Sequence, residues 1–330
     1  MKPLVQVQDL RKFYPGKPEI RAVDGVSLEI YPGETLSLVG ESGCGKSTTG
    51  RLILRLGGAK TGGKVYFDGM DLYDMRPKEL RRLRRRLQPV FQDPYSSLSP
   101  RLTVAQLMAE GVRTHCIVPQ RQTQDYVDTV LQRCGLQPAI KNRFPHEFSG
   151  GQRQRIAIAR ALSLKPDFVV CDEAVSALDV SVQAQIVNLL QDLQQEQNMS
   201  YLFISHDLSV VEHLSHRVAV MYLGRIVELA PTRELYAAPA HPYTRELLSA
   251  VLPPEPGRPL PEISPGSPGG LPRGCAYHTR CRYAMAGTCD RYIPFLQEIS
   301  PGHFCACHLH TNHKSQFLEQ FQIWNKGPLA

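Results

Sequence analysis

The segment Gly40-Glu-Ser-Gly-Cys-Gly-Lys-Ser47 constrains the fold more than any other, because it fits the pattern G-x-x-x-x-G-K-[ST]. The apolar run Thr35–Val39 precedes it and reads as a strand, and Thr48–Leu56 follows it and reads as a helix. Small residues let successive backbone N–H groups turn toward an anion, and the N-terminus of the following helix adds partial positive charge. The sequence therefore predicts a nucleotide-phosphate site on a strand–loop–helix unit.

The side chains of this loop have separate expected roles. Lys46 can reach the β- and γ-phosphates, and the Ser47 hydroxyl can bind Mg²⁺. Cys44 is expected to contribute only its backbone. The loop residues expected to bind the nucleotide are Gly40, Glu41, Ser42, Gly43, Cys44, Gly45, Lys46, Ser47 and Thr48.

Two later apolar runs, Phe168–Cys171 and Tyr201–Ser205, are short and rich in residues that favour strands. They read as buried strands of a parallel sheet, and the stretches Gln152–Ser163 and Val182–Glu196 read as helices. Strands that alternate with helices predict an α/β core. Residues 93–150 are mostly helical in pattern and are expected to form a helical insertion into that core.

The first of these strands ends in two carboxylates, Asp172 and Glu173. Ligands of α/β sheets bind beyond the carboxyl ends of the strands, so this pair is expected to face the nucleotide. Asp172 is placed to orient Mg²⁺ and its waters. Glu173 is placed to accept a proton from an attacking water molecule, or to polarise it.

Further motifs follow in an order that resembles ABC transporter ATPases, a P-loop NTPase family. The resemblance implies an ATPase that binds ATP and Mg²⁺. Its signature motif, commonly LSGGQ, corresponds to Phe148, Ser149, Gly150, Gly151 and Gln152. The remaining matches are the Q-loop glutamine Gln92, the D-loop Asp179, the switch histidine His206, and the adenine-stacking aromatic Tyr14, for which Phe13 is an alternative.

This resemblance also implies which residues are catalytic and which bind Mg²⁺. The expected catalytic residues are Glu173, His206, Lys46 and Gln92, and the expected Mg²⁺ ligands are Ser47, Gln92 and Asp172. The signature helix is expected to close on ATP held by a second subunit, so that two chains enclose two nucleotides head to tail. The N-terminus of a helix that bears Ser and two glycines is itself an anion site, which suits this role.

Other segments narrow the resemblance to the oligopeptide/dipeptide/nickel importer group. Phe91–Arg101 is similar to its FQDP…SLNPR stretch, with Ser99 where Asn is usual, and His241–Leu248 is similar to its HPYT element. Val175–Asp179 resembles the F-type ATPase of such importers, although Ala174 stands where Pro is usual. This implies a D-type partner ATPase, two membrane permease subunits and an extracytoplasmic solute-binding protein. It also implies a peripheral location on the cytoplasmic face of the membrane, with peptides or a related solute as cargo.

Composition divides the chain into three parts. Residues 1–250 carry the motifs, and residues 251–273 contain eight prolines and read as an extended linker. Residues 274–330 begin with a Cys-rich tail that holds five of the nine cysteines. Four thiolates can enclose a soft metal. The resemblance implies that these are Cys275, Cys281, Cys289 and Cys307, and that Cys305, His303 and His308 are less favoured ligands.

The cysteine spacing matches neither common zinc-finger pairs nor ferredoxin runs, so it predicts a metal without identifying it. The resemblance favours a 4Fe–4S cluster over zinc. Reduced, unbound cysteines, or disulfides formed on isolation, are the third interpretation.

The chain's charge and basic segments leave an alternative class open. A net charge of +7 and the run Arg81–Arg86 would suit nucleic acid, and a soluble ABC ATPase acting on DNA or ribosomes is the second hypothesis. The run is not interleaved with aromatics for base stacking, and the chain has one cassette, so we expect no nucleic-acid partner and interpret the run as an exposed helix face. No apolar run approaches the roughly 18 residues of a membrane span.

Overall fold

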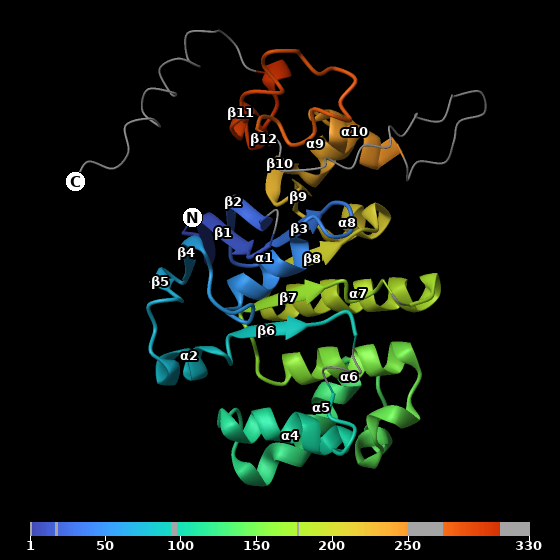
Figure 1. Ribbon diagram of the computed structural model, residues 1–330. Helices are drawn as coiled ribbons and strands as arrows, with labels where there is room; N and C mark the ends of the chain where they lie inside the picture. The colour runs from blue at the N-terminus through green and yellow to red at the C-terminus, as the bar shows by residue number, and fades with distance from the viewer. Residues whose placement is uncertain (1, 17–18, 94–97, 177, 250–272, 311–330) are drawn as a thin grey trace.

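The computed structural model describes residues 2–16, 19–93, 98–176, 178–249 and 273–310. Its centre is an eight-stranded sheet with the order β11-β12-β10-β9-β3-β8-β7-β6 (Figure 1). The strands are β3 (Thr35–Val39), β6 (Leu87–Val90), β7 (Phe168–Asp172), β8 (Ser200–Ser205), β9 (Arg217–Tyr222), β10 (Arg225–Pro231), β11 (Gln297–Ser300) and β12 (His303–Cys305).

The middle of this sheet is parallel. β3 pairs with β8 on one side and β9 on the other, and β7 pairs with β8 and β6, all in parallel. Every residue of β3, β7 and β8 is buried, as expected for apolar strands covered on both faces. The parallel arrangement brings the carboxyl ends of β3, β6, β7 and β8 to the same edge, where their functional loops begin. The expected α/β core is confirmed.

A second, antiparallel sheet packs beside the first, with the order β2-β1-β4-β5. It consists of β1 (Val5–Tyr14), β2 (Ile20–Ile30), β4 (Gly62–Phe67) and β5 (Met70–Asp71). Its inward residues, such as Val5, Leu10 and Phe67, form one hydrophobic core with Leu36 and Ile204 of the central sheet. Alternate residues of the same central strands, Phe203 among them, belong to a second core on the opposite face.

Helices cover both faces of the central sheet and form the expected helical insertion (Figure 1). The insertion is built on α4 and α5, which pack against α6, and Thr103 caps the start of α4 by accepting a hydrogen bond from the Gln106 backbone N–H. The helices are α1 (Lys46–Ile53), α2 (Pro77–Leu83), α4 (Val104–Thr114), α5 (Thr123–Arg133), α6 (Gly150–Leu162), α7 (Val180–Gln197), α8 (Leu208–Leu214), α9 (Thr232–Ala237) and α10 (Pro242–Ser249).

The basic run Arg81–Arg86, which begins in the last turn of α2, is only partly the exposed face that its sequence suggests. Arg84 donates hydrogen bonds to the carbonyl oxygens of Leu54 and Arg55, at 2.5 and 3.1 Å. Arg86 forms ion pairs with Asp68 and Asp167 at 3.1 and 2.5 Å. Arg81, Arg82 and Arg85 are exposed. Arg85 also donates to the Leu164 carbonyl oxygen at 3.3 Å, so three of the five arginines contact loops of the core.

The Cys-rich extension joins the central sheet, which its composition does not predict. β12 pairs antiparallel with β10 and with β11, so residues far along the chain extend the edge of the same sheet. Most of the expected linker, residues 251–272, lies outside the described residues, as do residues 311–330 of the tail.

A buried carboxylate fastens the extension at this edge. Glu228 on β10 is fully buried and accepts hydrogen bonds from the backbone N–H groups of Ala240 and His241, both at 2.8 Å. The Nε2 atom of His303 on β12 lies 2.7 Å from the same carboxylate. One side chain thus joins β10, the segment before α10, and the extension.

Candidate functional site

The Gly-rich loop lies between β3 and α1, as the sequence predicts. Gly40 and Gly45 have φ angles of +150° and +109°, which glycine adopts without the steric cost that other residues incur. A Cβ atom on Gly45 would lie 2.0 Å from the carbonyl oxygen of Ala22, and one on Gly40 would lie 2.2 Å from that of Met221. These close approaches fix both positions as glycine.

The loop's side chains separate into buried and exposed groups. Lys46 is 4% exposed, and its Nζ donates to the carbonyl oxygens of Gly40 and Glu41 at 2.7 and 2.9 Å. A phosphate that enters the loop can take over these hydrogen bonds. Glu41, Ser42 and Gly43 are exposed, Cys44 is buried, and Ser47 and Thr48 are half-buried in the first turn of α1.

Hard oxygen donors meet beside the loop. The Ser47 hydroxyl donates to Oδ1 of Asp172 at 2.6 Å, across the carboxyl end of β7. Burial raises the pKa of Asp172, and the hydrogen bond from Ser47 opposes that rise. Hydroxyl, carboxylate and amide oxygens are the ligands that Mg²⁺ prefers, so the donor set fits this ion.

Ser47, Asp172 and Gln92 line one cavity of about 640 Å³, together with residues of α6 such as Arg160. Gln92 itself is exposed and follows β6. The cavity therefore lies between the parallel core and α6 of the helical part. The next part of the FQDP stretch, residues 94–97, lies outside the described residues.

Glu173 and His206 leave neighbouring strands and face each other. The Glu173 side chain is 15% exposed, and one of its oxygens lies 3.5 Å from Nδ1 of His206, which is 52% exposed. The backbone of Glu173 has a φ of +49°, and its N–H donates to the carbonyl oxygen of Ile204 at 2.9 Å. This turn directs the carboxylate away from the sheet, next to the imidazole.

The signature segment opens α6 with reciprocal capping hydrogen bonds. Gln152 N–H donates to the Ser149 hydroxyl at 3.3 Å, and Ser149 N–H donates to the Gln152 side chain at 3.1 Å. Phe148 is buried, whereas Ser149, Gly150 and Gln152 are exposed, and a Cβ on Gly151 would lie 2.6 Å from Val182. Within the described ranges, these five residues are absent from the lining of the cavity beside Ser47.

Asp179, the predicted D-loop residue, begins the next helix. Its carboxylate accepts a hydrogen bond from Val182 N–H at 2.9 Å and so caps α7. Since Val182 also contacts Gly151, the D-loop and the signature turn support each other.

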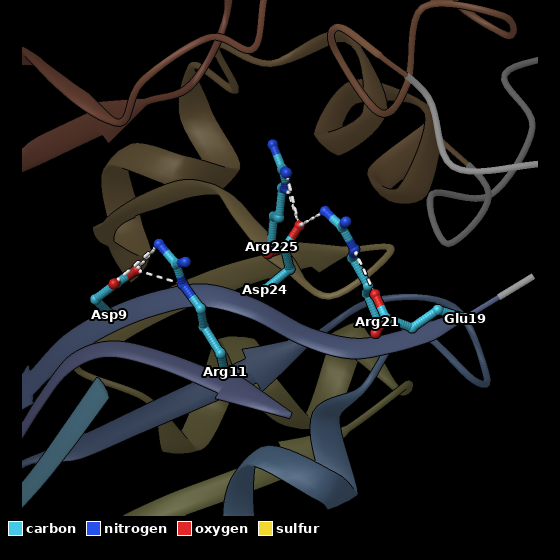
Figure 2. A network of polar contacts seen from close by, with 6 residues as sticks. All are labelled: Asp9, Arg11, Glu19, Arg21, Asp24 and Arg225. Atoms are coloured by element: carbon cyan, nitrogen blue, oxygen red, sulfur yellow. Dashed lines mark hydrogen bonds and ion pairs between the residues drawn. The ribbon is translucent and has the colours of Figure 1, made fainter. Parts of the chain in front are cut away.

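Tyr14 ends β1 and is 40% exposed, with Lys12 Nζ 4.9 Å from its ring centroid. The neighbouring Phe13 is covered by the Arg21 guanidinium, 5.0 Å from the ring centroid. Arg21 belongs to the network in Figure 2, where it lies 3.8 Å from Asp24 and 3.3 Å from Glu19. Tyr14 is thus the more accessible of the two aromatic candidates.

The same network anchors this aromatic segment to the central sheet. Arg225, on β10, donates to Asp24 through two nitrogens at 3.0 and 2.6 Å, and Asp24 lies on β2 (Figure 2). The Asp24 N–H also donates to the Gly224 carbonyl at 2.8 Å. Such an ion pair is stronger when its side chains are shielded from water, and those of Arg225 and Asp24 are only 25% and 12% exposed.

The four predicted thiol ligands lie near one another in the extension. Burial, together with the nearby thiols of Cys289, Cys307 and Cys281, raises the pKa of Cys275 to about 11. The Cys275 N–H donates to the Cys289 carbonyl at 2.8 Å. In the described ranges, no group of three or more His, Cys, Asp or Glu side chains is arranged so that it could hold a metal ion. The four cysteine thiols are therefore chemically suited to a soft metal and lie near one another. Their arrangement in the structure does not form a metal site.

The less favoured ligands of the tail are engaged elsewhere. His303 contacts Glu228, and His308 Nε2 lies 2.9 Å from the Tyr292 carbonyl oxygen. Cys305 is fully buried in a small apolar cluster with Ala240 and Cys307.

Two side chains at the phosphate loop were missed by sequence reasoning. The hydroxyl of Tyr243 accepts a hydrogen bond from the Glu41 N–H at 2.9 Å, and the Arg280 guanidinium contacts the Glu41 carboxylate. Tyr243 lies inside the HPYT element. This motif indicated the importer group, but it assigned no role to Tyr243. No local pattern distinguishes Arg280 from other arginines of the tail.

Comparisons with known proteins agree with this geometry. The family model "ABC transporter" matches residues 23–176, and the model "Oligopeptide/dipeptide transporter, C-terminal region" matches residues 227–289. The probable peptide ABC transporter ATP-binding protein y4tS of Sinorhizobium fredii is 51% identical, over 93% of this chain and 90% of its own length. The oligopeptide transport ATP-binding protein AppF of Bacillus subtilis is 47% identical, over 93% and 98%.

Solved structures with the same fold include the MJ0796 cassette, described as dimeric and bound to ADP and Pi. It has a TM-score of 0.64 and 30% identity, and the match covers 69% of this chain and 99% of that one. The structure of cbiO1 from Clostridium perfringens has a TM-score of 0.64 and 28% identity, covering 72% and 92%. With the phosphate loop, the paired carboxylates and the signature helix in place, the chain belongs to the ABC transporter family, as one of its ATP-hydrolysing cassettes.

Proposed function

We propose that this chain is the ATPase that drives import of dipeptides, longer peptides or a related solute through an ABC transporter. The observation that carries the proposal is the match of residues 227–289 to the oligopeptide/dipeptide transporter C-terminal region. That region contains the HPYT element at His241–Leu248. The peptide-transport names of the two relatives support the same cargo class.

The partners in this proposal are a second, related ATPase, two membrane permease subunits and an extracytoplasmic solute-binding protein. The chain itself docks as a peripheral subunit on the cytoplasmic face of the membrane. In the described ranges, no helix has the length and apolar character of a membrane span. The exposed Ser149, Gly150 and Gln152 support pairing of two ATPases, because they are available to a nucleotide held by another chain. The dimeric form of the MJ0796 cassette supports it as well.

Reconstitution of the complete complex tests the cargo. When the chain is assembled with its permease subunits, partner ATPase and binding protein in liposomes, we expect labelled peptide to accumulate only with ATP. We also expect peptide-loaded binding protein to stimulate ATP hydrolysis. Liposomes without the binding protein are the control. The proposal is wrong if peptides are not taken up and the chain associates instead with DNA or ribosomes in the absence of membrane subunits.

The proposal gives each residue of the site a role. Tyr14 stacks on adenine, and the loop from Gly40 to Thr48 holds the β- and γ-phosphates with Lys46. Ser47, Asp172 and Gln92 are the residues that would hold Mg²⁺, which supplies positive charge against the phosphate oxygens.

Glu173 takes the proton of the attacking water molecule, and its position suits that step. His206, 3.5 Å from its carboxylate, keeps the carboxylate oriented toward the nucleotide. Phe148, Ser149, Gly150, Gly151, Gln152 and the D-loop Asp179 complete the site of the partner ATPase.

The chain divides, in this proposal, into a nucleotide-binding domain at residues 1–250 with a helical subdomain at about 93–150, a linker at 251–273, and a Cys-rich extension at 274–330. The pairing of β12 with β10 supports treating the extension as a docked part of the molecule.

The extension, we propose, holds a 4Fe–4S cluster on Cys275, Cys281, Cys289 and Cys307, with Zn²⁺ as the alternative occupant. Their proximity and the engagement of His303 and His308 elsewhere support this ligand set. Thiolates suit both iron–sulfur clusters and zinc. Ligation by any of these metals requires loss of the thiol protons.

Metal analysis of anaerobically purified full-length protein tests this assignment. We expect about 4 iron and 4 sulfide per chain and a brown colour, the composition and colour of one 4Fe–4S cluster on four thiolates. Cys281→Ser should lose most of the iron, whereas Cys116→Ser, at an exposed cysteine elsewhere, should retain it. Stoichiometric zinc without iron would refute the cluster, and protein free of both metals would refute any metal centre.

A further inference from the structure

The extension reaches the phosphate loop through one arginine. Nη1 of Arg280 donates to both carboxylate oxygens of Glu41, the second residue of the loop, at 2.9 and 3.1 Å. Nη2 of the same guanidinium donates to Glu246 on α10. The Arg280 side chain is only 11% exposed, whereas Glu41 is 44% exposed. The guanidinium therefore bridges the extension, α10 and the phosphate loop.

Aromatic rings hold this guanidinium in place. Its Cζ atom lies 5.9 Å from the ring centroid of Tyr222 and 5.7 Å from that of Tyr277. The two rings lie 5.4 Å apart in an edge-to-face arrangement, and the Tyr277 hydroxyl donates to Glu246. Rings that face a cation stabilise it and restrict its movement.

Glu41 is held at its backbone as well as at its side chain. Its N–H donates to the Tyr243 hydroxyl at 2.9 Å, and Tyr243 is fully buried in contact with Tyr222 and Tyr277. One aromatic cluster, made of Tyr222, Tyr243 and Tyr277, thus supports both the loop backbone and the arginine that faces the loop carboxylate.

The carboxylate of Glu41 brings negative charge close to the phosphate site, and Arg280 supplies positive charge beside it. A loop that wraps phosphates places its backbone N–H groups and Lys46 around several negative charges. A bare carboxylate at the second loop position would repel those charges and would be free to change its rotamer. The Arg280 guanidinium places positive charge between the carboxylates of Glu41 and Glu246, and its Nη1, which donates to both oxygens of Glu41, fixes the position of that side chain.

We propose that Arg280 is a positioning residue for ATP binding, which neutralises and holds Glu41 so that the C-terminal extension forms part of the nucleotide site. The proposed role of Arg280 requires only that the chain binds ATP. It does not depend on the cargo of the transporter or on a metal in the extension.

Nucleotide affinity of the full-length chain tests the proposal. A fluorescent N-methylanthraniloyl-ATP with Mg²⁺ reports the dissociation constant directly. We expect Arg280→Gln to weaken binding about three- to tenfold, which is less than the loss of a fully buried charge pair costs, because the Glu41 side chain is 44% exposed. Arg282→Gln changes an exposed arginine two residues away, and it should retain the wild-type affinity.

A second substitution separates charge neutralisation from simple disruption. If Arg280 acts through Glu41, adding Glu41→Gln to Arg280→Gln should recover most of the lost affinity, because the uncompensated carboxylate is gone. Unchanged affinity in Arg280→Gln would overturn the proposal, and so would a loss that the double variant does not recover.

A charge-retaining substitution covers the case in which Arg280→Gln does not fold. Arg280→Lys keeps the positive charge beside Glu41 and Glu246, so we expect its affinity to stay within about threefold of the wild type. A loss of about tenfold or more in folded Arg280→Lys protein, checked by its thermal unfolding, would contradict neutralisation as the role of this residue.

Discussion

Replacement of Glu173 by Gln is expected to lower ATP turnover by about 100-fold or more while ATP stays bound, the usual cost of losing a general base. Gln has the same shape as Glu and keeps the backbone turn, where Glu173 has a φ of +49°. It cannot accept a proton from the attacking water molecule. The phosphate loop, the Ser47–Asp172 contact and Tyr14 are unchanged, so the dissociation constant for ATP should stay near that of the wild type.

Steady-state hydrolysis by the assembled complex, measured beside nucleotide binding, checks this expectation. Glu196→Gln, at an exposed position on α7, is the matched control and should hydrolyse ATP at the wild-type rate. Because the variant binds ATP without consuming it, it should also accumulate in the closed, paired state of the two ATPases. A Glu173→Gln complex whose ATP turnover rate stayed within about threefold of the wild-type rate would contradict this assignment. The proton of the attacking water molecule would then go to another acceptor.

Replacement of Glu228 by Ala is expected to destabilise the protein by about 3–5 kcal/mol, because three buried groups lose their hydrogen-bond partner and each such loss costs about 1–3 kcal/mol. The fully buried carboxylate accepts from the N–H groups of Ala240 and His241 and contacts His303 Nε2. Without it, two backbone donors and an imidazole are buried with no acceptor, and each such group costs free energy. Glu228→Gln should also be destabilising, because its amide would present a donor to one of those N–H groups.

Thermal unfolding and limited proteolysis measure this effect. The extension should be cleaved faster in Glu228→Ala than in the wild type, since the lost contacts lie between β10, β12 and the segment before α10. Glu234→Ala removes an exposed carboxylate from α9 and should leave both measurements unchanged. A Glu228→Ala protein with wild-type melting temperature and protease resistance would show that the carboxylate is not the anchor of the extension.

The nucleotide site could be predicted from the sequence because its parts are local. Gly40–Ser47 is a strand–loop–helix unit whose geometry depends on neighbouring residues, and Asp172 and Glu173 end an apolar strand. Parallel pairing then brings these strand ends together at one edge. The capping hydrogen bonds of Ser149 are local in the same way, since they span three residues.

The rest depends on contacts between distant parts of the chain. Arg280 and Glu41 are separated by 239 positions, and neither residue carries a sequence pattern that points to the other. No sequence pattern marks Glu228 as buried, and its contacts come from β12 and from the segment before α10. The run Arg81–Arg86 looks uniform in sequence, yet Arg84 and Arg86 bind core loops that composition cannot identify.

The position of β12 has a consequence for synthesis of the protein. β10 emerges from the ribosome with one free edge, and exposed strand edges are templates for pairing with other chains. Residues 303–305 of β12, which cover this edge, are translated about seventy residues later, at the roughly 5–20 residues per second typical of synthesis. During those seconds the nascent cassette exposes an aggregation-prone edge, so stalled or prematurely terminated translation between β10 and β12 should leave insoluble products.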